Sequence, residues 1–514
     1  METKIINITP FTCAIEIVNE FCYYGNQYYQ VYVNGKFAFV DNRNVFTVYN
    51  LVAGKENEIK LMFDDEVAIL SIRTPVVKRI IDVRDYQAVG DGIADDTCAL
   101  QTAIDHCGDQ EVVVIPAGHY YTKPLFLKSN IMIYLEKDAS LKGWLNRDDY
   151  PVLPGVKIVD GKEILMASWE GKNQNSFASL ITGIDVENIV IFGEGTIDGQ
   201  AHKSDWWVNH RQMRKAWRPN LIFLNRCKNV VVTGVTVTNS PSWTMHPYYS
   251  STIDFIDVRV INPEDAPNTD GCNPESSDNI HIIGCYFSVG DDCIALKSGK
   301  IEMVANHYKK TEQIKIRNCM MRDGHGAVVL GSEMSCGISD IEVKQCLFIN
   351  TDRGLRIKTR RGRGDKAIID KVKFTNIIMD KVLNPFVVNM FYFCDPDGKT
   401  EYVASKNKLA IDERTPYLGE LSFENIVCKN TVVSAGYFYG LPEQPIAKIT
   451  LKNIATDFLN SEHKGVPAMM ADCMAVNRLG FYFNNVDEIH IDHVQIEGQI
   501  GEQFILHQVK KVVK

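Results

Sequence analysis

The segment IHIIGCYFSVGDDCIAL, residues 280–296, contains the pattern that predicts the fold. Apolar residues stand at Ile280, Ile282 and Cys285, which are positions i, i+2 and i+5, and two carboxylates follow at Asp291 and Asp292. The i, i+2 alternation is typical of a short β-strand with one buried face. The same three-position pattern recurs at intervals of roughly 25 to 50 residues, as the repeat of a solenoid does. Its nine instances begin at Val230, Ile253, Ile280, Ile314, Ile341, Val372, Leu421, Ile449 and Ile489.

A repeat of this kind predicts a parallel β-helix. Short strands at nearly regular spacing, with insertions of variable length between them, are typical of a chain that coils into a solenoid. Successive coils then stack about 4.8 Å apart, which is the ordinary spacing of hydrogen-bonded strands. The segment DDTCALQTAIDHC, residues 95–107, has helical spacing and is predicted to cap the open end of the solenoid.

The N-terminal part of the chain has a different pattern, in which short strands alternate with turn signals. YYQVYVNGKFAFV, residues 28–40, is predicted to be a β-hairpin with a turn at Asn34-Gly35, and NVFTVYNL and NEIKLMF are predicted strands. We therefore expect a small β-sandwich over residues 1–77, which resembles a fibronectin type III domain. RTPVVKRIIDV, residues 73–83, is interpreted as the linker, and the solenoid is expected to span residues 78–514.

Composition argues against several classes of protein. The 514 residues are 45% hydrophobic and 23% charged, which is ordinary for a chain with a large core. A net charge of −9 argues against nucleic acids and anionic membranes as partners. The sequence shows no secretory signal and no apolar run as long as a membrane span, so we expect a cytoplasmic protein. Many of the 14 cysteines fall within apolar runs and are expected to be reduced core thiols.

The repeat also predicts which polar residues lie side by side. Six residues past the last motif position, three consecutive coils carry Asp291, His325 and Asp352. These residues are therefore expected to occupy equivalent points on neighbouring coils. The strands that follow are CIAL, AVVL and GLRI, and they align as an inward ladder of Ile294, Val328 and Leu355.

The same register gathers further charged side chains on the outer face. Aligning NTDGCNP with GDDCIAL places Asp270 one coil before Asp292, and Arg356 and Lys358 point outward two coils later. Three clustered carboxylates cannot all ionise at low cost, so one of them should retain a proton above its normal pKa. A protonated acid beside an ionised carboxylate is what glycoside hydrolysis requires. The adjacent cations suit a sugar that is itself an anion, such as a uronic acid.

Four tripeptides carry a resemblance to a known family. NTD (268–270), GDD (290–292), GHG (324–326) and RIK (356–358) resemble, in order and spacing, the signatures of the polygalacturonases, glycoside hydrolase family 28. DVRDYQAVGDGIADDT, residues 82–97, is similar to the N-terminal cap of right-handed β-helix pectin-active enzymes. The resemblance implies a mainly β, right-handed parallel β-helix of the pectin-lyase-like kind. It also implies metal-free hydrolysis of α-1,4-galacturonosyl bonds, without a cofactor and with inversion at the anomeric carbon.

The resemblance further implies roles for individual residues. Asp291 corresponds to the general acid, and Asp270 and Asp292 correspond to the pair that orients and deprotonates water. His325 would hold the protonation state of Asp291, its neighbour in the equivalent coil position. The substrate-binding residues that the resemblance implies are Arg356 and Lys358, at the substrate carboxylate, and Asn268, which would support the water site.

Long inserts between the strands bear on the mode of action. Segment 142–180 and the 49-residue interval after Ile377 are long for one coil, and such inserts would close an end of the groove. RPNLIF and NSPSWTMHP also resemble the bacterial exo-acting branch, as does the fibronectin-like module. We therefore expect exo action on short oligogalacturonides.

Some charged and aromatic features have a structural interpretation beside a functional one. TRRGRGDK, residues 359–366, is interpreted as an exposed basic loop, and Lys297 as a solvated or ion-paired residue of the strand face. Three aromatic clusters are candidates to stack on sugar rings, with core or loop packing as the alternative. They are Trp206-Trp207, Trp243 to Tyr249 and Phe391 to Phe393.

Four alternatives stay open beside exo-polygalacturonase. They are an endo-polygalacturonase, a family hydrolase for rhamnogalacturonan or xylogalacturonan, a pectate lyase and a non-catalytic β-helix that binds polysaccharide. A lyase would need calcium-binding acids and a base for the C5 proton, whereas the placement of His325 and of RIK matches the hydrolases. The expected partner is an oligogalacturonide or a pectic polysaccharide, and nothing in the sequence predicts the oligomeric state.

Overall fold

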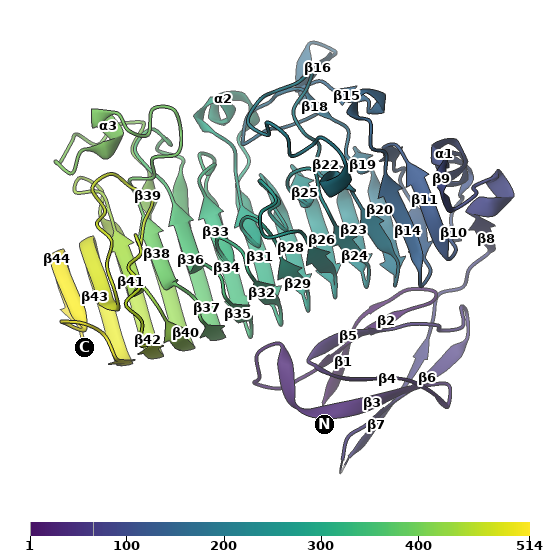
Figure 1. Cartoon of the computed structure of the whole chain (residues 1–514), viewed down its shortest axis with the longest axis horizontal. Coiled ribbons are helices and arrows are strands. Elements are labelled where there is room, and N and C mark those ends of the chain that lie inside the picture. Colours follow the sequence, from purple (N-terminus) through teal and green to yellow (C-terminus); the bar gives the residue numbers. More distant parts are fainter. Residues whose placement is uncertain (1, 65) are drawn as a thin grey trace.

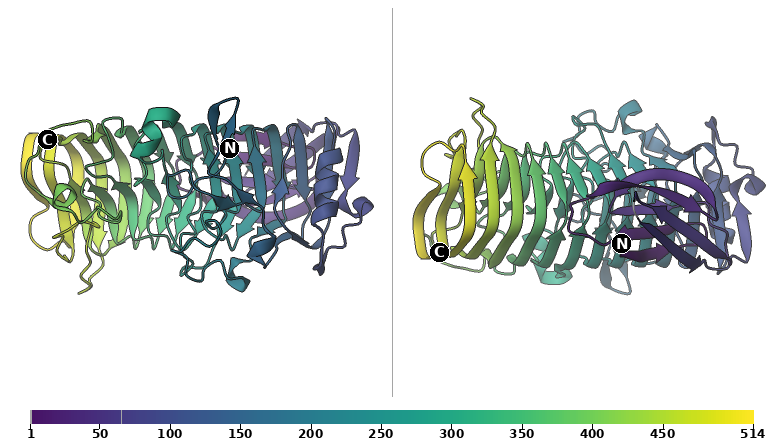
Figure 2. Two further views of the ribbon diagram at one scale, coloured as in Figure 1. Left: turned by 90° about the horizontal axis from the view of Figure 1, so that it is seen from above. Right: turned by 90° about the horizontal axis from the view of Figure 1, so that it is seen from below.

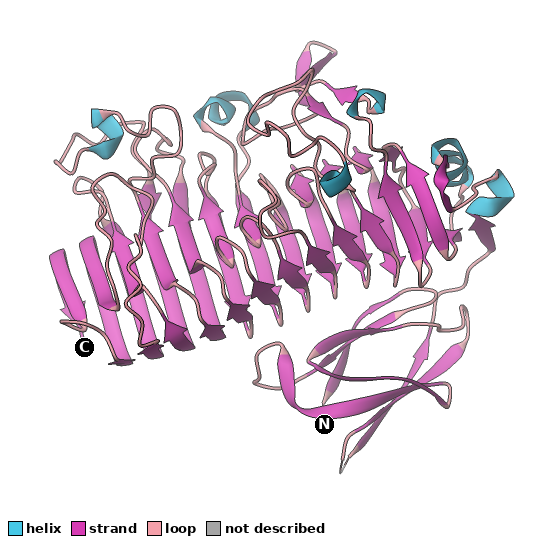
Figure 3. Ribbon diagram, in the orientation of Figure 1, coloured by secondary structure: helices cyan, strands magenta, loops and turns pink. Residues whose placement is uncertain are grey.

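The computed structural model describes residues 2–64 and 66–514, and most of its regular structure is β-strand. Figure 1 and Figure 3 show a long solenoid of stacked strands with a smaller β domain beside its N-terminal half. In the described residues, no helix is both long and apolar enough to span a membrane. The α-helices are α1 (Thr97–His106), α2 (Val304–His307) and α3 (Glu401–Ala404).

The N-terminal domain consists of two antiparallel sheets with strand orders β1-β2-β5 and β4-β3-β6-β7. Residues of both sheets, among them Ile15, Val31 and Leu61, pack in one apolar core, so the domain is a β-sandwich. Asn34 and Gly35 have positive φ angles of 48° and 78° at the turn of the predicted hairpin β3–β4. The likeness to fibronectin type III stays a prediction. The strands are β1 (Thr3–Ile8), β2 (Cys13–Ile17), β3 (Tyr24–Val33), β4 (Lys36–Arg43), β5 (Val45–Val48), β6 (Glu56–Met62) and β7 (Val67–Arg73).

The predicted repeat forms a parallel ladder along the solenoid. The first motif residue of each coil pairs with its equivalent on the next, from Val230 and Ile253 through to Ile449 and Ile489. The parallel β-helix is therefore confirmed. The strands that carry the motif are β23 (Lys228–Thr233), β26 (Ser251–Ile256), β28 (Asp278–Ile283), β31 (Thr311–Arg317), β34 (Ile338–Lys344), β37 (Ile368–Asp380), β40 (Glu420–Thr431), β42 (Ile446–Phe458) and β43 (Leu479–Glu497).

The same ladder extends upstream of the region where the pattern was recognised. Strand β13 (Ile131–Leu135) pairs with β20 (Glu187–Gly193), which pairs with β23. These two coils do not show the complete apolar pattern, because a glutamate, Glu136 or Glu194, occupies its third position. Strand β8 (Arg79–Asp82) pairs with β10 (Glu111–Ile115), so the end of the linker segment 73–83 already forms the first strand of the solenoid.

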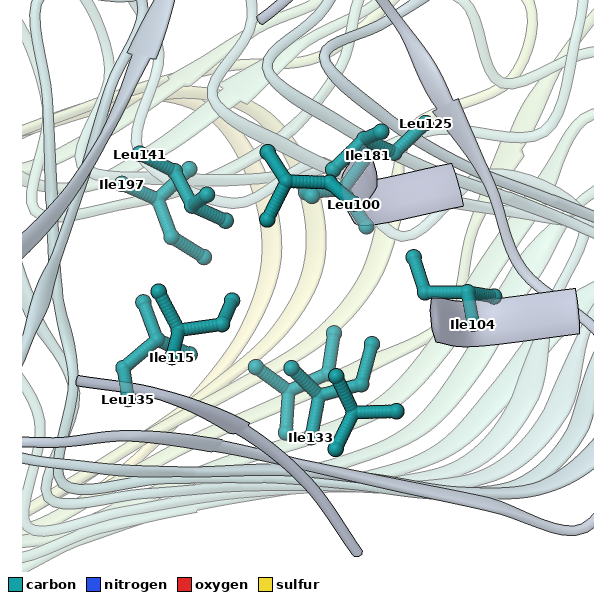
Figure 4. A pocket seen from close by; sticks show the side chains of 11 residues that line it. Leu100, Ile104, Ile115, Leu125, Ile133, Leu135, Leu141, Ile181 and Ile197 are labelled. Carbon is teal, nitrogen blue, oxygen red and sulfur yellow. The ribbon is translucent and has the colours of Figure 1, made fainter. Parts of the chain in front are cut away.

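Helix α1 caps the N-terminal end of the solenoid, as predicted. Its apolar residues Leu100, Ala103 and Ile104 are buried against the first coils. Figure 4 shows a cavity beneath this helix, lined by Leu100, Ile104, Ile133 and other aliphatic side chains. Because the lining residues are all apolar, this cavity is a packing gap in the core and not a site for chemistry.

The sandwich packs along one side of the solenoid (Figure 1, Figure 2). Arg43 forms an ion pair with Asp257 at 2.5 Å, and the backbone N–H of Thr47 donates to the same carboxylate at 2.8 Å. Glu16 pairs with Arg317 two coils further along. Helices α2 and α3 and strands β16 (Val156–Val159) and β18 (Ser176–Phe177) lie along the opposite edge in Figure 1. The two domains therefore contact each other over several coils, away from the long inserts.

Candidate active site

Three short strands bring the predicted site residues together. Strands β30 (Ile294–Leu296), β33 (Val328–Gly331) and β36 (Arg353–Lys358) pair in parallel. Ile294 pairs with Val328, and Val328 with Leu355, as the sequence predicted. Cys272 bridges to Ile294, which places Asp270 beside Asp292 on the preceding coil.

The three predicted carboxylates form one compact cluster. One carboxylate oxygen each of Asp270, Asp291 and Asp292 lies within 4.8 Å of the others. Asp270 and Asp292 are almost completely buried, at 3% and 1% exposure, whereas Asp291 is partly open to solvent. Asn273 Nδ2 donates to Asp270 Oδ2 at 2.8 Å. Asp291 is therefore the member of the cluster that a substrate can reach most easily.

Asp292 is the carboxylate that the surrounding cations keep ionised. Lys358 Nζ donates to its Oδ2 at 2.7 Å, and Arg356 Nη1 lies 3.4 Å from its Oδ1. Burial alone would raise the pKa of Asp292, but Lys358 and Arg356 outweigh burial and hold this pKa well below its usual range. The negative charge of the cluster is therefore concentrated on Asp292.

The pKa values of the other two carboxylates, Asp291 and Asp270, are shifted in the opposite direction. Burial and the neighbouring Asp292 charge raise the pKa of Asp291. Burial and the Asp291 carboxylate raise the pKa of Asp270 well above its usual value. The raised pKa favours the protonated form of Asp291, which is the form that a general acid needs. Asp292, rather than Asp270, carries the charge that a catalytic base needs in the free protein.

His325 lies at the exposed rim of the cluster. Its Nδ1 is 2.9 Å from Asp352 Oδ2, and its backbone N–H donates to the carbonyl oxygen of Asp291 at 3.0 Å. The hydrogen bond with Asp352 raises the pKa of His325 above its usual value. The Asp352 carboxylate therefore favours the imidazolium form of His325, next to the acid whose protonation it is predicted to control.

The variant Asp352→Asn is expected to move the alkaline limb of the kcat/KM profile to lower pH. Asp352 favours protonated His325, so losing the carboxylate lets His325 release its proton at a lower pH. Rate profiles between pH 4 and pH 9 would measure the shift. Asp340→Asn, at an exposed ion pair with Lys371, is the control and should leave both limbs in place. An unchanged alkaline limb in Asp352→Asn would show that catalysis does not depend on the protonation of His325.

Lys297 lies beside the carboxylate cluster, and of its two interpretations from the sequence the ion-paired one is confirmed and the solvated one is wrong. Its Nζ donates to Glu333 Oε2 at 2.8 Å and lies 4.9 Å from the centre of the Trp243 ring. Only 5% of Lys297 is exposed, and it acts on the pKa values of both Asp270 and Asp292. The sequence does indicate that Lys297 lies on the same face as Lys358. IALK (294–297) and LRIK (355–358) both end in a lysine at the same register position.

Arg218 supports the predicted residue Asn268. Arg218 Nη2 donates to Asn268 Oδ1 at 2.6 Å, and Nη1 donates to the carbonyls of Pro241 and Pro267 at 2.8 and 2.9 Å. The guanidinium also lies 5.2 Å from the Trp169 ring centre. Burial lowers the pKa of Arg218 to about 10. Sequence reasoning missed this contact because residue 218 lies in an insert, outside the repeat.

The interpretation of residues 359–366 as an exposed basic loop is wrong for its three arginines, although Asp365 and Lys366 are exposed. Arg360, Arg361 and Arg363 are buried, at 5%, 1% and 3% exposure. Each pairs with a carboxylate from a distant segment, among them Asp395 and Glu443. These arginines therefore anchor inserts around the site and are not a free surface for polyanions.

The aromatic clusters mostly pack within the protein. Trp206 is fully buried against Tyr150 and Phe177. Trp243 and Phe391 are also buried, with 8% and 1% exposure. Core packing, which was the structural interpretation, thus accounts for Trp206 and Phe391. Trp243 instead lies over Lys297 and lines a small pocket together with Trp169 and Asn268.

Comparison with known proteins agrees with the site geometry. A family model described as glycosyl hydrolases family 28 matches residues 113–413. A probable polygalacturonase of Vitis vinifera is 31% identical over 402 residues, 76% of this chain and 77% of that protein. An endo-polygalacturonase of Pectobacterium carotovorum subsp. carotovorum is 30% identical over 312 residues, 58% of this chain and 72% of that protein.

A solved structure extends this likeness to the full length. The family 28 exopolygalacturonase of Yersinia enterocolitica superposes with a TM-score of 0.72 at 20% identity, covering 99% of this chain and 98% of that one. Its likeness shows the shared fold, a right-handed β-helix together with the N-terminal sheets. The matching family model, spanning more than half of the chain, and the predicted cluster lead to one conclusion: the chain belongs to glycosyl hydrolase family 28.

Proposed function

We propose that this glycoside hydrolase cleaves α-1,4-galacturonosidic bonds by an inverting acid/base mechanism and acts on chain ends. The observation that carries the proposal is the division of charge between two adjacent carboxylates. Asp292 is held ionised by Lys358 and Arg356, while the pKa of Asp291 is raised. Asp291 donates its proton to the leaving glycosidic oxygen, and Asp292 accepts a proton from the attacking water.

Inversion is proposed although the carboxylates lie close together. Inverting enzymes usually hold their two carboxyl groups about 6.5–9.5 Å apart, whereas oxygen atoms of this cluster lie within 4.8 Å. Asp292 nevertheless makes a poor nucleophile, because it is 1% exposed and both of its oxygens face cations. In an inverting mechanism the carboxylate acts as a base on a water molecule, which attacks the anomeric carbon from the face opposite the leaving oxygen.

Two cations favour a uronic acid as the substrate. Arg356 and Lys358 are 6% and 7% exposed, and both form ion pairs with Asp292. A sugar carboxylate placed above them gains charge-assisted hydrogen bonds that a neutral hexose lacks. The ion pairs with Asp292 position both cations before the substrate arrives.

Exo action is proposed because the site face is covered on both sides of the cluster. Upstream, the outward residues His246 and Tyr248 on β25 (Met245–Tyr248) are fully buried. Tyr248 packs with Leu165, and its hydroxyl donates to Asn173 Oδ1 at 3.2 Å. Downstream, Val387 on β38 (Asn384–Asn389) is 2% exposed. A site face that is covered on both sides suits a chain end, whereas an endo enzyme needs an open face along the strands.

A time course on polygalacturonate and on di-, tri- and hexagalacturonate, with chelator present, tests the proposal. We expect monomer or dimer from the first minutes, no absorbance of an unsaturated product, and a β-anomer as the first product in proton NMR. Products of intermediate length would contradict exo action, and an α-anomer would contradict inversion. No hydrolysis of any galacturonide would redirect the proposal to rhamnogalacturonan or xylogalacturonan.

A further inference from the structure

The segment between β42 and β43, residues 459–478, lies across the site face just past the predicted substrate-binding cations. Gly465 and Val476 exchange two backbone hydrogen bonds of 3.0 and 2.9 Å, which close the segment into a loop. Asn477 Nδ2 donates to the carbonyl of Ser461 at 2.9 Å and ties the base of the loop together. We refer to residues 459–478 as the barrier loop.

The barrier loop contacts the site directly. Met469 Sδ lies 2.6 Å from Arg356 Nη2, and the Met469 carbonyl accepts a hydrogen bond from Asn389 Nδ2 at 3.1 Å. Arg353 Nη2 donates to the carbonyl of Val466 at 3.3 Å. Arg356 is predicted to bind the substrate carboxylate. Met469 therefore lies beside the sugar that this arginine would hold.

The barrier loop is anchored on both sides of Met469. Ala468 and Met470 are 2% and 4% exposed and belong to the main apolar core of the solenoid. Cys473 Sγ lies 3.8 Å from the hydroxyl of Tyr437. Because its neighbours are buried in the core, Met469 is held in place above the strands.

Without this loop, the groove would continue along the strands. The outward position after Arg356 is Val387 on β38, and the next is Tyr437 on β41 (Ser434–Tyr439). On the same two strands, Lys358 pairs with Asn389, which is therefore the next outward position after this lysine. Val387 and Asn389 are each only 2% exposed, although their register places them on the outer face. The face that would bind further sugar units is therefore covered.

We propose that the barrier loop is a specificity element that ends the groove at the sugar held by Arg356 and Lys358. The ligand class is a short galacturonide with one of its two ends at Met469, since further units on that side would collide with the loop. The inference rests on the proposed function, because it assumes a galacturonide substrate. It assigns the length restriction on this side to Met469 and its loop.

Two variants and a matched control test the inference. Met469→Ala removes the side chain next to Arg356, and a second variant replaces residues 466–475 with Gly-Gly, joining the paired Gly465 and Val476. Met474→Ala is the control, because this methionine of the same loop is 81% exposed. The quantity to measure is kcat/KM for hexagalacturonate divided by kcat/KM for digalacturonate, together with the thermal midpoint of each protein.

We expect this ratio to rise by about tenfold in the shortened-loop variant, which equals ~1.4 kcal/mol of added transition-state contact. A smaller rise in the same direction is expected for Met469→Ala, and no change for Met474→Ala. An unchanged ratio in a folded shortened-loop variant that still cleaves digalacturonate would overturn the inference alone. A wild-type protein that cleaves no galacturonide would instead overturn the proposed function, so the two failures are distinguishable.

Discussion

The variant Asp291→Asn is expected to lower kcat by roughly 10²- to 10⁴-fold, the usual contribution of a positioned general acid. Burial and the adjacent Asp292 charge raise the pKa of Asp291, so this group can deliver a proton to the leaving oxygen. An amide has the same shape but no proton acidic enough to transfer. KM for trigalacturonate should change little, because Arg356 and Lys358 remain. Initial rates across a range of substrate concentrations would separate the two parameters.

Thermal unfolding provides the control for Asp291→Asn. Removing one of three crowded carboxylates relieves electrostatic repulsion, so the thermal midpoint should stay the same or rise. Asp340→Asn, on the solvated surface, should match the wild type in both rate and midpoint. Turnover within a factor of about two of the wild type, in a folded Asp291→Asn variant, would eliminate Asp291 as the general acid.

The solenoid and the centre of its site were predictable because the repeat encodes register. Once Ile294, Val328 and Leu355 align, the positions of Asp291, His325 and Arg356 follow from counting residues. Each coil stacks on the previous one, so a local pattern determines contacts between residues that lie about 30 positions apart. No tertiary information beyond the period was needed for these residues.

The surroundings of the site were not predictable, because the inserts have no period. Lys297 is buried and contacts Glu333 and Trp243, which lie outside the three-position pattern. Met469 reaches Arg356 from a loop more than 100 positions away in the chain. The register gives the direction in which a strand residue points, but it does not tell which insert lies above that residue. Exo or endo action depends on those inserts, so it could not be predicted from the register alone.

The burial of the arginines in the segment 359–366 also could not be predicted from the register. Breaking one of their ion pairs is expected to have a large effect on stability. Arg361 is 1% exposed and binds Glu443 through two contacts, of 2.5 Å at Nε and 2.9 Å at Nη2. It also donates to the carbonyls of Tyr402, Ser405 and Asn407 at 3.1, 2.6 and 3.1 Å. One guanidinium thus connects the segment after the RIK strand to the insert that carries α3. In the sequence, the counter-charge lies 82 positions away and gives no local signal.

Glu443→Ala is therefore expected to reduce the free energy of unfolding by about 3–5 kcal/mol, because it leaves the Arg361 charge buried without its partner. Urea titration followed by tryptophan fluorescence would measure the change. Lys366→Ala is the control from the same segment, since its ion pair with Asp365 is more than half exposed and should contribute no more than about 1 kcal/mol. Equal losses in the two variants would show that burial does not amplify the Arg361 pair. A large loss for Glu443→Ala alone would establish that this buried pair holds the insert against the solenoid.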